Sequence, residues 1–284
     1  MKLLRYGRPG KEKPGLFDDE GRIRDLSAII PDLGPEQLND KALRKLAKID
    51  PASLPLVRGN PRIGVPVARV GKFLGIGLNY ADHAAETGAQ VPAEPVVFMK
   101  ATTCLNGPDD PIMLPKGSKK TDFEVELGVV IGTRARHVPE AEAMNYVAGF
   151  CVVNDVSERE YQKERGGGQW TKGKGCDTFG PVGPWLVTRD EVWDMDDLDL
   201  YLDVNGKRMQ TGNTGTMVFR VPFLVSYLSQ FMTLEPGDII ATGTPPGVGM
   251  ARTPPRFLKR GDKLRLGIPG LGEQQQEVVA YSAG

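Results

Sequence analysis

The chain has few of the residues that build disulfide frameworks or thiolate metal sites. It contains three cysteines in 284 residues, and Cys104, Cys151 and Cys176 have no close paired spacing. An odd, widely spaced set argues against a disulfide framework and against a zinc site built from thiolates. We therefore expect free, mostly buried thiols.

An excess of charge of one sign is also absent, as are long apolar runs. Thirty-six basic residues balance 36 acidic ones, so no overall field attracts phosphate backbones or anionic lipid. No uninterrupted apolar stretch reaches the length that spans a bilayer, and the first residues lack the apolar region of a signal peptide. We expect a cytoplasmic protein with no nucleic-acid and no membrane partner.

Glycine and proline, in contrast, are abundant, with 35 and 23 residues. Short apolar runs between them favour strands and loops, so we predict an α+β fold that is mainly β, with peripheral helices. A proline-punctuated stretch over Pro51–Pro66 predicts a small N-terminal domain, residues 1–69, and a second domain, residues 70–284. Strands broken by a turn at Asp18–Gly21 are expected within Lys2–Ile30. The expected helices are Pro35–Ile49, Tyr80–Thr87, Val156–Arg165 and Val221–Phe231.

Two carboxylates at alternate positions stand out in an apolar strand pattern. Glu124 and Glu126 share one face of the strand predicted over Asp122–Ile131, about 7 Å apart at their Cα atoms. Anions at that spacing repel unless water or a cation lies between them, and Mg2+ prefers oxygen ligands. Asp155, at the end of the apolar run Val147–Val153, is the candidate third ligand. The alternative is a solvated strand face.

The two histidines receive different interpretations. His137 lies in a polar turn and is expected to be exposed. His83 precedes Glu86 by three residues, on the same face of a predicted helix. A carboxylate partner fixes the imidazole tautomer and raises its basicity, as in a general base for water. An ordinary helical hydrogen bond is the alternative.

Two further segments carry chemistry. The turn Thr242–Gly247 follows an apolar strand and presents backbone N–H groups and hydroxyls suited to an anionic oxygen, although a plain turn remains open. Lys174 precedes the constrained stretch Phe179–Pro184. A lysine held near acidic residues stabilises negative charge that develops on a substrate.

The order of these motifs resembles the fumarylacetoacetate hydrolase family over residues 70–284. The resemblance implies a mixed, highly curved β-sheet roll with peripheral helices and a small N-terminal domain. It also implies a homodimer and a Mg2+ site, with Mn2+ as the other candidate. The motifs that carry it are Gly77–Tyr80 with His83 and Glu86, Phe98–Lys100, Asp122–Glu126, Asn154–Asp155, Lys174 with Asp177–Pro184, and Thr242–Gly247.

The resemblance assigns roles to individual residues. It implies metal ligands at Glu124, Glu126 and Asp155, a water-activating pair at His83 and Glu86, and a charge stabiliser at Lys174. Substrate contacts are implied at Tyr80, Lys100, Gln162 and Thr244. Many acylpyruvate-cleaving members carry Arg where this chain has Leu78, which weakens the transfer of their substrates.

The resemblance implies hydrolysis of a carbon–carbon bond in a 2,4-diketo acid, which yields pyruvate and a carboxylic acid. The local motifs resemble the sugar-acid branch of the family, which includes 2,4-diketo-3-deoxy-L-rhamnonate hydrolases. Oxaloacetate decarboxylation and a ureidoglycolate lyase reaction are alternatives within the family. A non-catalytic metal-binding dimer is the alternative from another class, although it has no use for His83, Lys174 and Thr244 together.

Overall fold

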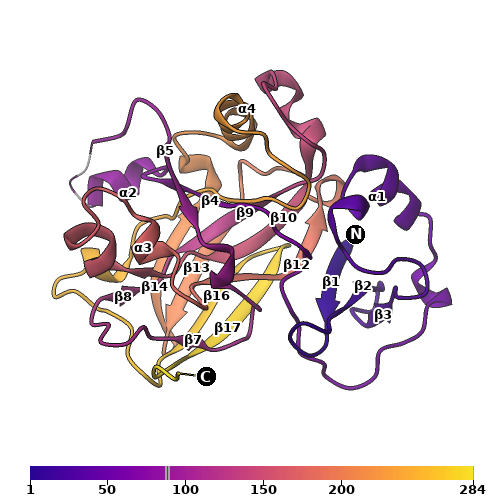
Figure 1. Ribbon diagram of the computed structural model, residues 1–284, viewed down its shortest axis with the longest axis horizontal. Helices are drawn as coiled ribbons and strands as arrows, with labels where there is room; N and C mark the ends of the chain where they lie inside the picture. The colour runs from indigo at the N-terminus through magenta and orange to yellow at the C-terminus, as the bar shows by residue number, and fades with distance from the viewer. Residues whose placement is uncertain (87, 89, 284) are drawn as a thin grey trace.

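A large mixed β-sheet forms the centre of the computed structural model, which describes residues 1–86, 88 and 90–283 (Figure 1). Its strand order is β3-β2-β1-β12-β10-β9-β15-β4-β5, with β6 paired to β12. The strands are β1 Lys2–Tyr6, β2 Lys13–Phe17, β3 Ile23–Asp25, β4 Phe73–Gly77, β5 Val96–Lys100, β6 Leu105–Asn106, β9 Val125–Ile131, β10 Val147–Asn154, β12 Gly180–Thr188 and β15 Ile239–Ala241.

A second sheet, in the order β14-β13-β16-β17-β7, lies against the first. In β17 buried and exposed residues alternate, as expected of a strand with one face in the core. All residues of β9 and β10, in contrast, are buried, because both faces of the first sheet are covered. The strands are β7 Ile112–Met113, β13 Asp199–Val204, β14 Lys207–Asn213, β16 Lys263–Ile268 and β17 Gly272–Val279.

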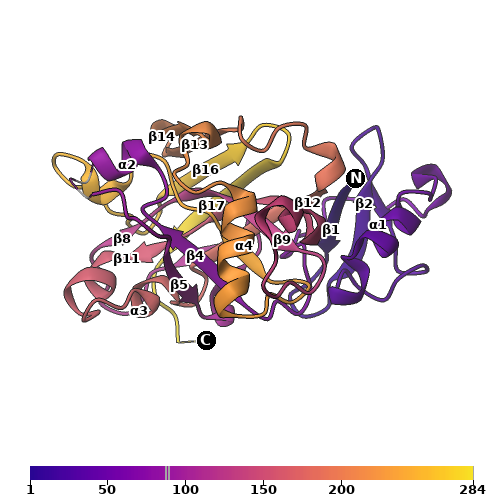
Figure 2. The ribbon, with the colours of Figure 1, turned by 90° about the horizontal axis from the view of Figure 1, so that it is seen from above.

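The helices lie at the periphery, as Figure 2 shows from above. They are α1 Asp40–Leu46, α2 Ala81–Glu86, α3 Thr171–Lys174 and α4 Val221–Phe231. The prediction for α4 is confirmed residue for residue, since Pro222 suits the first turn and apolar residues recur at helical spacing. In α2, the predicted last residue Thr87 lies outside the described residues. None of the helices described here is both long and apolar enough to cross a bilayer.

Two helix predictions need correction. The helix predicted over Pro35–Ile49 is shorter, because the Asn39 side chain accepts the N–H of Ala42 and begins a new helix there. The helix predicted over Val156–Arg165 starts instead as strand β11, Ser157–Glu158, which pairs with β8, Thr121–Asp122. A π-helical turn, Glu160–Glu164, follows.

The N-terminal strands continue the central sheet, because β1 pairs with β12 at Leu3 and Leu186. The predicted strands in Lys2–Ile30 and the turn at Asp18–Gly21 are confirmed, with a further turn between β1 and β2. The α+β fold with curved mixed sheets is also confirmed. The division near residue 69 stays a prediction.

Candidate active site

Two neighbouring antiparallel strands bring three carboxylates together. Glu124 directly precedes β9, Glu126 is the second residue of β9, and Asp155 directly follows β10, where Val153 is opposite Glu126. The backbone N–H of Asp155 donates to the carbonyl of Glu124 at 2.8 Å. All three side chains are buried, and one oxygen of each lies within 4.8 Å of the others.

Two buried lysines neutralise part of this acidic cluster. The Nζ atom of Lys174 lies 2.6 Å from both Glu124 Oε2 and Asp155 Oδ2. Lys100 Nζ lies 2.6 Å from Asp155 Oδ1 and donates to the carbonyls of Val156 and Lys174. Lys100 therefore fixes Asp155 and the end of α3 from behind and does not line the pocket in front of the carboxylates.

The three carboxylates differ in how their charge is compensated. Burial raises the pKa of Glu126 well above its usual value, and the charges of Asp155 and Glu124 raise it further. Burial also acts to raise the pKa of Glu124, but the charges of Lys174 and Arg159 outweigh this effect and hold the pKa of Glu124 below its usual range. Burial alone would lower the pKa of Lys174, yet Asp155 and Glu124 raise it.

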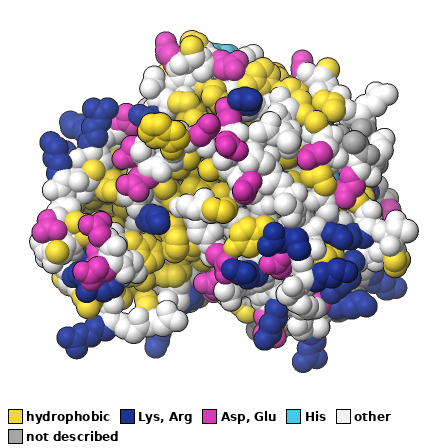
Figure 3. Space-filling model, turned by 180° about the vertical axis from the view of Figure 1, so that it is seen from behind, with side chains coloured by type: hydrophobic (Ala, Val, Ile, Leu, Met, Phe, Trp, Pro, Cys, Tyr) yellow, Lys and Arg dark blue, Asp and Glu magenta, His cyan; other side chains and the backbone are white. Residues whose placement is uncertain are grey.

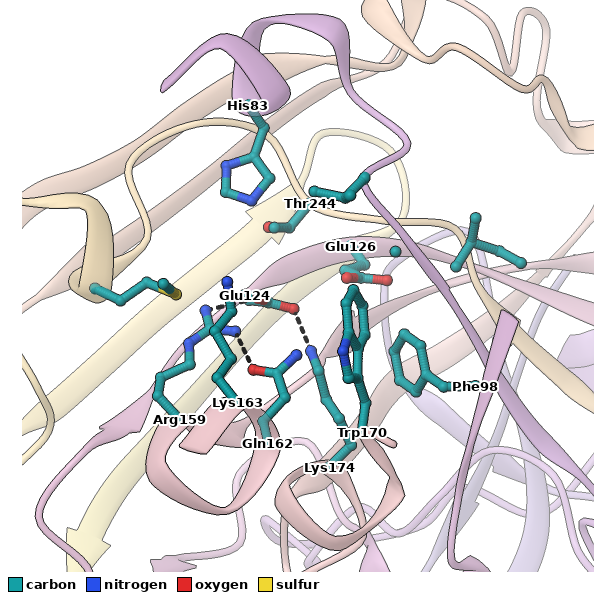
Figure 4. A pocket seen from close by; sticks show the side chains of 14 residues that line it. His83, Phe98, Glu124, Glu126, Arg159, Gln162, Lys163, Trp170, Lys174 and Thr244 are labelled. Atoms are coloured by element: carbon teal, nitrogen blue, oxygen red, sulfur yellow. Dashed lines mark hydrogen bonds and ion pairs between the residues drawn. The ribbon is translucent and has the colours of Figure 1, made fainter. Parts of the chain in front are cut away.

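A buried guanidinium links the carboxylates to the neighbouring loop. Arg159 donates from Nη2 to Glu124 Oε1 at 2.7 Å and from Nε to Asp122 Oδ2 at 2.9 Å. Asp122 in turn accepts the backbone N–H groups of Gly249 and Met250 at 2.7 and 3.0 Å. Gln162 Oε1 accepts from Arg159 Nη1 at 3.0 Å, which turns the amide toward the pocket (Figure 4).

His83 lies across the pocket from the carboxylates (Figure 4), and its partner Glu86 lies behind it, outside the pocket lining. His83 Nδ1 and Glu86 Oε2 are 3.2 Å apart, so the expected pair is present. The backbone N–H of Gly247 donates to both Glu86 oxygens at 3.0 Å, so the loop after β15 fixes the carboxylate that orients the imidazole.

The remaining predicted residues lie in two different settings. Gln162 and Thr244 line the pocket, whereas Tyr80 is fully buried and does not. The Thr244 hydroxyl already donates to the carbonyl of Val125 at 2.9 Å and accepts from Gln210 at 2.7 Å. The Tyr80 hydroxyl has no hydrogen-bond partner among the described residues, and burial raises its pKa.

Apolar side chains complete the pocket wall. Phe98 and Trp170 contact each other with ring centroids 5.5 Å apart, and both line the pocket. Gly77 lies beneath Trp170, where an added Cβ atom would come within 2.3 Å of the indole. Leu78 also lines the pocket and contributes an apolar side chain there.

Sequence reasoning missed several pocket residues. Arg159, Lys163, Trp170 and Met250 all line it. A charged residue four positions after Asp155 could have been noted as a candidate. Its pairing with Asp122 and Glu124 depends on strand pairing that spacing alone does not reveal.

Residues 72–279 match the family model described as fumarylacetoacetate (FAA) hydrolase C-terminal. The chain belongs to the fumarylacetoacetate hydrolase family. A Burkholderia ambifaria protein named "Putative hydrolase" is 68% identical over 97% of this chain and 98% of its own length. Membership places the chain among hydrolases and isomerases that share this fold.

Solved structures of this family superpose along almost the whole chain. A fumarylacetoacetate hydrolase from Exiguobacterium antarcticum is 34% identical with a TM-score of 0.88, over 99% of this chain and all of that one. A maleylpyruvate hydrolase from Sphingobium sp. SYK-6 is 31% identical with a TM-score of 0.82 and the same coverage. A 5-carboxymethyl-2-hydroxymuconate delta-isomerase from Mycobacterium smegmatis is 32% identical with a TM-score of 0.77, and the match covers 99% of this chain and all of the isomerase chain.

The buried acidic triad fits a divalent metal, as expected in this family. Three carboxylate oxygens that lie within 4.8 Å of one another form an all-oxygen donor set, which suits Mg2+ or Mn2+. Glu126 forms no ion pair with the described residues and accepts one hydrogen bond, from the N–H of Gly243 at 2.8 Å. A cation between these groups would offset the repulsion that raises the pKa of Glu126.

Proposed function

We propose that this protein is a metal-dependent hydrolase that cleaves a carbon–carbon bond in a 2,4-diketo acid and releases pyruvate and a carboxylic acid. The observation that carries the proposal is His83, which is paired with Glu86 and lines the same pocket as Glu124 and Glu126 of the acidic triad. A carboxylate-oriented imidazole opposite an acidic metal site suits the activation of water.

Glu124, Glu126 and Asp155 would hold Mg2+ or Mn2+, which supplies a Lewis acid for the carboxylate and 2-keto oxygens of the substrate. Phe98 and Trp170 would contact the carbon chain. Gln162 would orient the carbonyl that is attacked, and the turn that contains Thr244 would bind a carboxylate oxygen. Tyr80 and Lys100 are buried behind the pocket, and we propose that they support its wall and Asp155.

His83 takes a proton from a water molecule that attacks the C4 carbonyl, while Glu86 holds the imidazole in place. The C3–C4 bond then breaks, and its electron pair passes to C3 of the departing pyruvate enolate. Lys174 stabilises the negative charge that develops there, because its ammonium lies in the same buried cluster. The imidazolium of His83 returns the proton to C3, so water is added across the broken bond.

The proposal also covers the substrate, the oligomeric state and the cellular compartment. Among substrates, 2,4-diketo-3-deoxy-L-rhamnonate and related acylpyruvates are the candidates that the local motifs favour. We also propose a homodimer in the cytoplasm. The cytoplasm is a reducing compartment, and Cys104, Cys151 and Cys176 are all free thiols, as expected of a protein in such a compartment.

The test measures pyruvate release from a panel of acylpyruvates and 3-deoxy-2,4-diketo sugar acids, with Mg2+ and then with a chelator. Metal-dependent pyruvate and an equimolar carboxylic acid are expected, with loss of turnover in His83→Ala. Pyruvate and CO2 from oxaloacetate alone, with full activity in His83→Ala, would identify a decarboxylase instead. That reaction requires no attacking water.

A further inference from the structure

Lys163 differs from the other charged side chains that line the pocket. Glu124, Arg159 and Lys174 form short ion pairs with one another or with neighbours, and Glu126 accepts a backbone N–H. Lys163 forms neither a hydrogen bond nor an ion pair with the described residues. Its ammonium is therefore the pocket cation that remains available to a ligand.

Local backbone geometry directs Lys163 into the pocket. The turn Glu160–Glu164 is π-helical, and the N–H of Arg165 donates to the carbonyl of Glu160 at 2.9 Å. Consecutive residues Gln162 and Lys163 both line the pocket as a result. Such π-helical turns occur frequently at functional sites, because they place side chains where a regular helix would not.

The surroundings of Lys163 call for an anion. Figure 4 shows Lys163 beside Arg159, extending toward the side of the pocket on which His83 lies. Lys163 is exposed at the rim of the pocket, and its partial burial there and the nearby Arg159 lower its pKa. The carboxylates of Glu124 and Asp122 act in the opposite direction, but both already form ion pairs, Glu124 with Arg159 and Lys174 and Asp122 with Arg159. Leu78 adds no cation elsewhere along the wall.

We propose that Lys163 binds a second carboxylate at the far end of the substrate, so that the preferred substrate is a 2,4-diketo acid with a terminal carboxylate. This inference rests on the proposed function, and among its candidate substrates it favours acylpyruvates with a terminal carboxylate over 2,4-diketo-3-deoxy-L-rhamnonate. A dianionic substrate would place one carboxylate at the acidic triad's cation and the other at Lys163. Polyhydroxylated sugar acids would leave this ammonium without a counter-charge.

Turnover of two substrates of equal length provides the first test. Succinylpyruvate and butyrylpyruvate differ in that the first ends in a carboxylate and the second in a methyl group. We expect kcat/KM for succinylpyruvate to fall about fivefold in Lys163→Met, through KM, because a partly exposed ion pair is lost. Lys163→Arg should retain the preference, and butyrylpyruvate should be unaffected. Equal kcat/KM values in the wild type, or a preference for a 3-deoxy-2,4-diketo sugar acid, would overturn the inference.

A matched variant controls for the general loss of positive charge. Lys172 lies on α3, which packs against the π-helical turn, and its exposed ammonium contacts the carbonyl of Arg165 outside the pocket. Lys172→Met changes the net charge by the same amount as Lys163→Met. Because the Lys172 ammonium lies outside the pocket, this variant should leave both kcat/KM values unchanged. A fall as large as that of Lys163→Met would show that charge in general, not the pocket ammonium, sets the preference.

Binding of ligands that cannot be hydrolysed separates this inference from the proposed function. Titration calorimetry of Mg2+-loaded protein would compare 2-oxoheptanedioate with 2-oxoheptanoate, which lack the 4-keto group. Tighter binding of the dianion that Lys163→Met abolishes would support the inference even if no diketo acid is cleaved. Equal binding of both ligands, unchanged in the variant, would overturn it even if hydrolysis is observed.

Discussion

Glu126 differs from the other two carboxylates of the triad because no ammonium or guanidinium among the described residues pairs with it. Of the three, it therefore depends most on a bound cation for charge compensation. We expect Glu126→Gln to weaken Mg2+ and Mn2+ binding at least tenfold and to abolish turnover. Calorimetric titration of the metal checks this. Glu277→Gln, a change on a strand outside the pocket, is the control, and unchanged metal affinity in Glu126→Gln would remove this residue from the site.

At the residue scale the His83–Glu86 pair also makes a prediction. Loss of a general base costs about 10²- to 10⁴-fold in rate. We expect a fall of that size in kcat for His83→Ala and a smaller fall for Glu86→Gln, because the amide still reaches the imidazole and the N–H of Gly247. Single-turnover kinetics with succinylpyruvate measure this. A full rate in His83→Ala would refute the role of the pair.

At the scale of elements, Asp122 joins strand β8 to the loop after β15. It accepts from Arg159 and from the N–H groups of Gly249 and Met250. Asp122→Asn leaves a buried guanidinium partly uncompensated, and we expect it to lower the free energy of unfolding by about 3 kcal/mol. Urea denaturation measures this, with the exposed Asp177→Asn as control. A change below about 0.5 kcal/mol would mean that Glu124 alone compensates Arg159.

The hairpin of β16 and β17 carries a pH-dependent contribution. Arg265 and the Tyr201 hydroxyl lower the pKa of Glu273 to about 2, from the usual 4.5. A lowered folded-state pKa stabilises the protein above pH 4.5, and this stabilisation is lost as the pH falls toward 2. We expect wild type to exceed Glu273→Gln in urea stability at pH 7, and the gap to narrow at pH 3. A gap that does not change with pH would contradict this.

At the scale of elements, local residue spacing was predictable from the sequence, whereas long-range pairing was not. Period-two spacing brought Glu124 and Glu126 to one acidic cluster, although the strand predicted over Asp122–Ile131 is interrupted after Asp122 and β9 begins only at Val125. Period 3.6 gave the exact limits of α4. The segment after Asp155 was misjudged as a helix because pairing of β11 with β8 is a long-range event. For the same reason, the hydrogen bond that joins Glu86 to Gly247 across 161 residues has no local signal.

At the scale of the whole molecule, the N-terminal residues supply a neighbour for β12. Strand β1 pairs with β12, and Leu3 and Leu4 are fully buried. We expect residues 70–284 expressed alone to aggregate, because this strand would present an unpaired edge. Solubility and size-exclusion chromatography test this. A monodisperse, cooperatively folded fragment would instead establish residues 1–69 as a separate domain.

The space-filling view from behind shows apolar side chains gathered in broad areas between charged groups (Figure 3). Such surface is common where a second copy docks. A homodimer is therefore open to a direct measurement, the molar mass in solution by light scattering. We expect about twice the 30.9 kDa of one chain. A mass of a single chain across the micromolar range would exclude the dimer.

The position of Lys174 also affects the order in which the chain folds and binds its metal. Its ammonium already bridges Glu124 and Asp155, so the protein carries an internal counter-ion for most of its acidic cluster. Folding therefore does not have to wait for a metal, unlike in small zinc domains that are unfolded without theirs. The chain can fold first and acquire its cation afterwards. Chelation should then yield a folded, reversibly silenced protein.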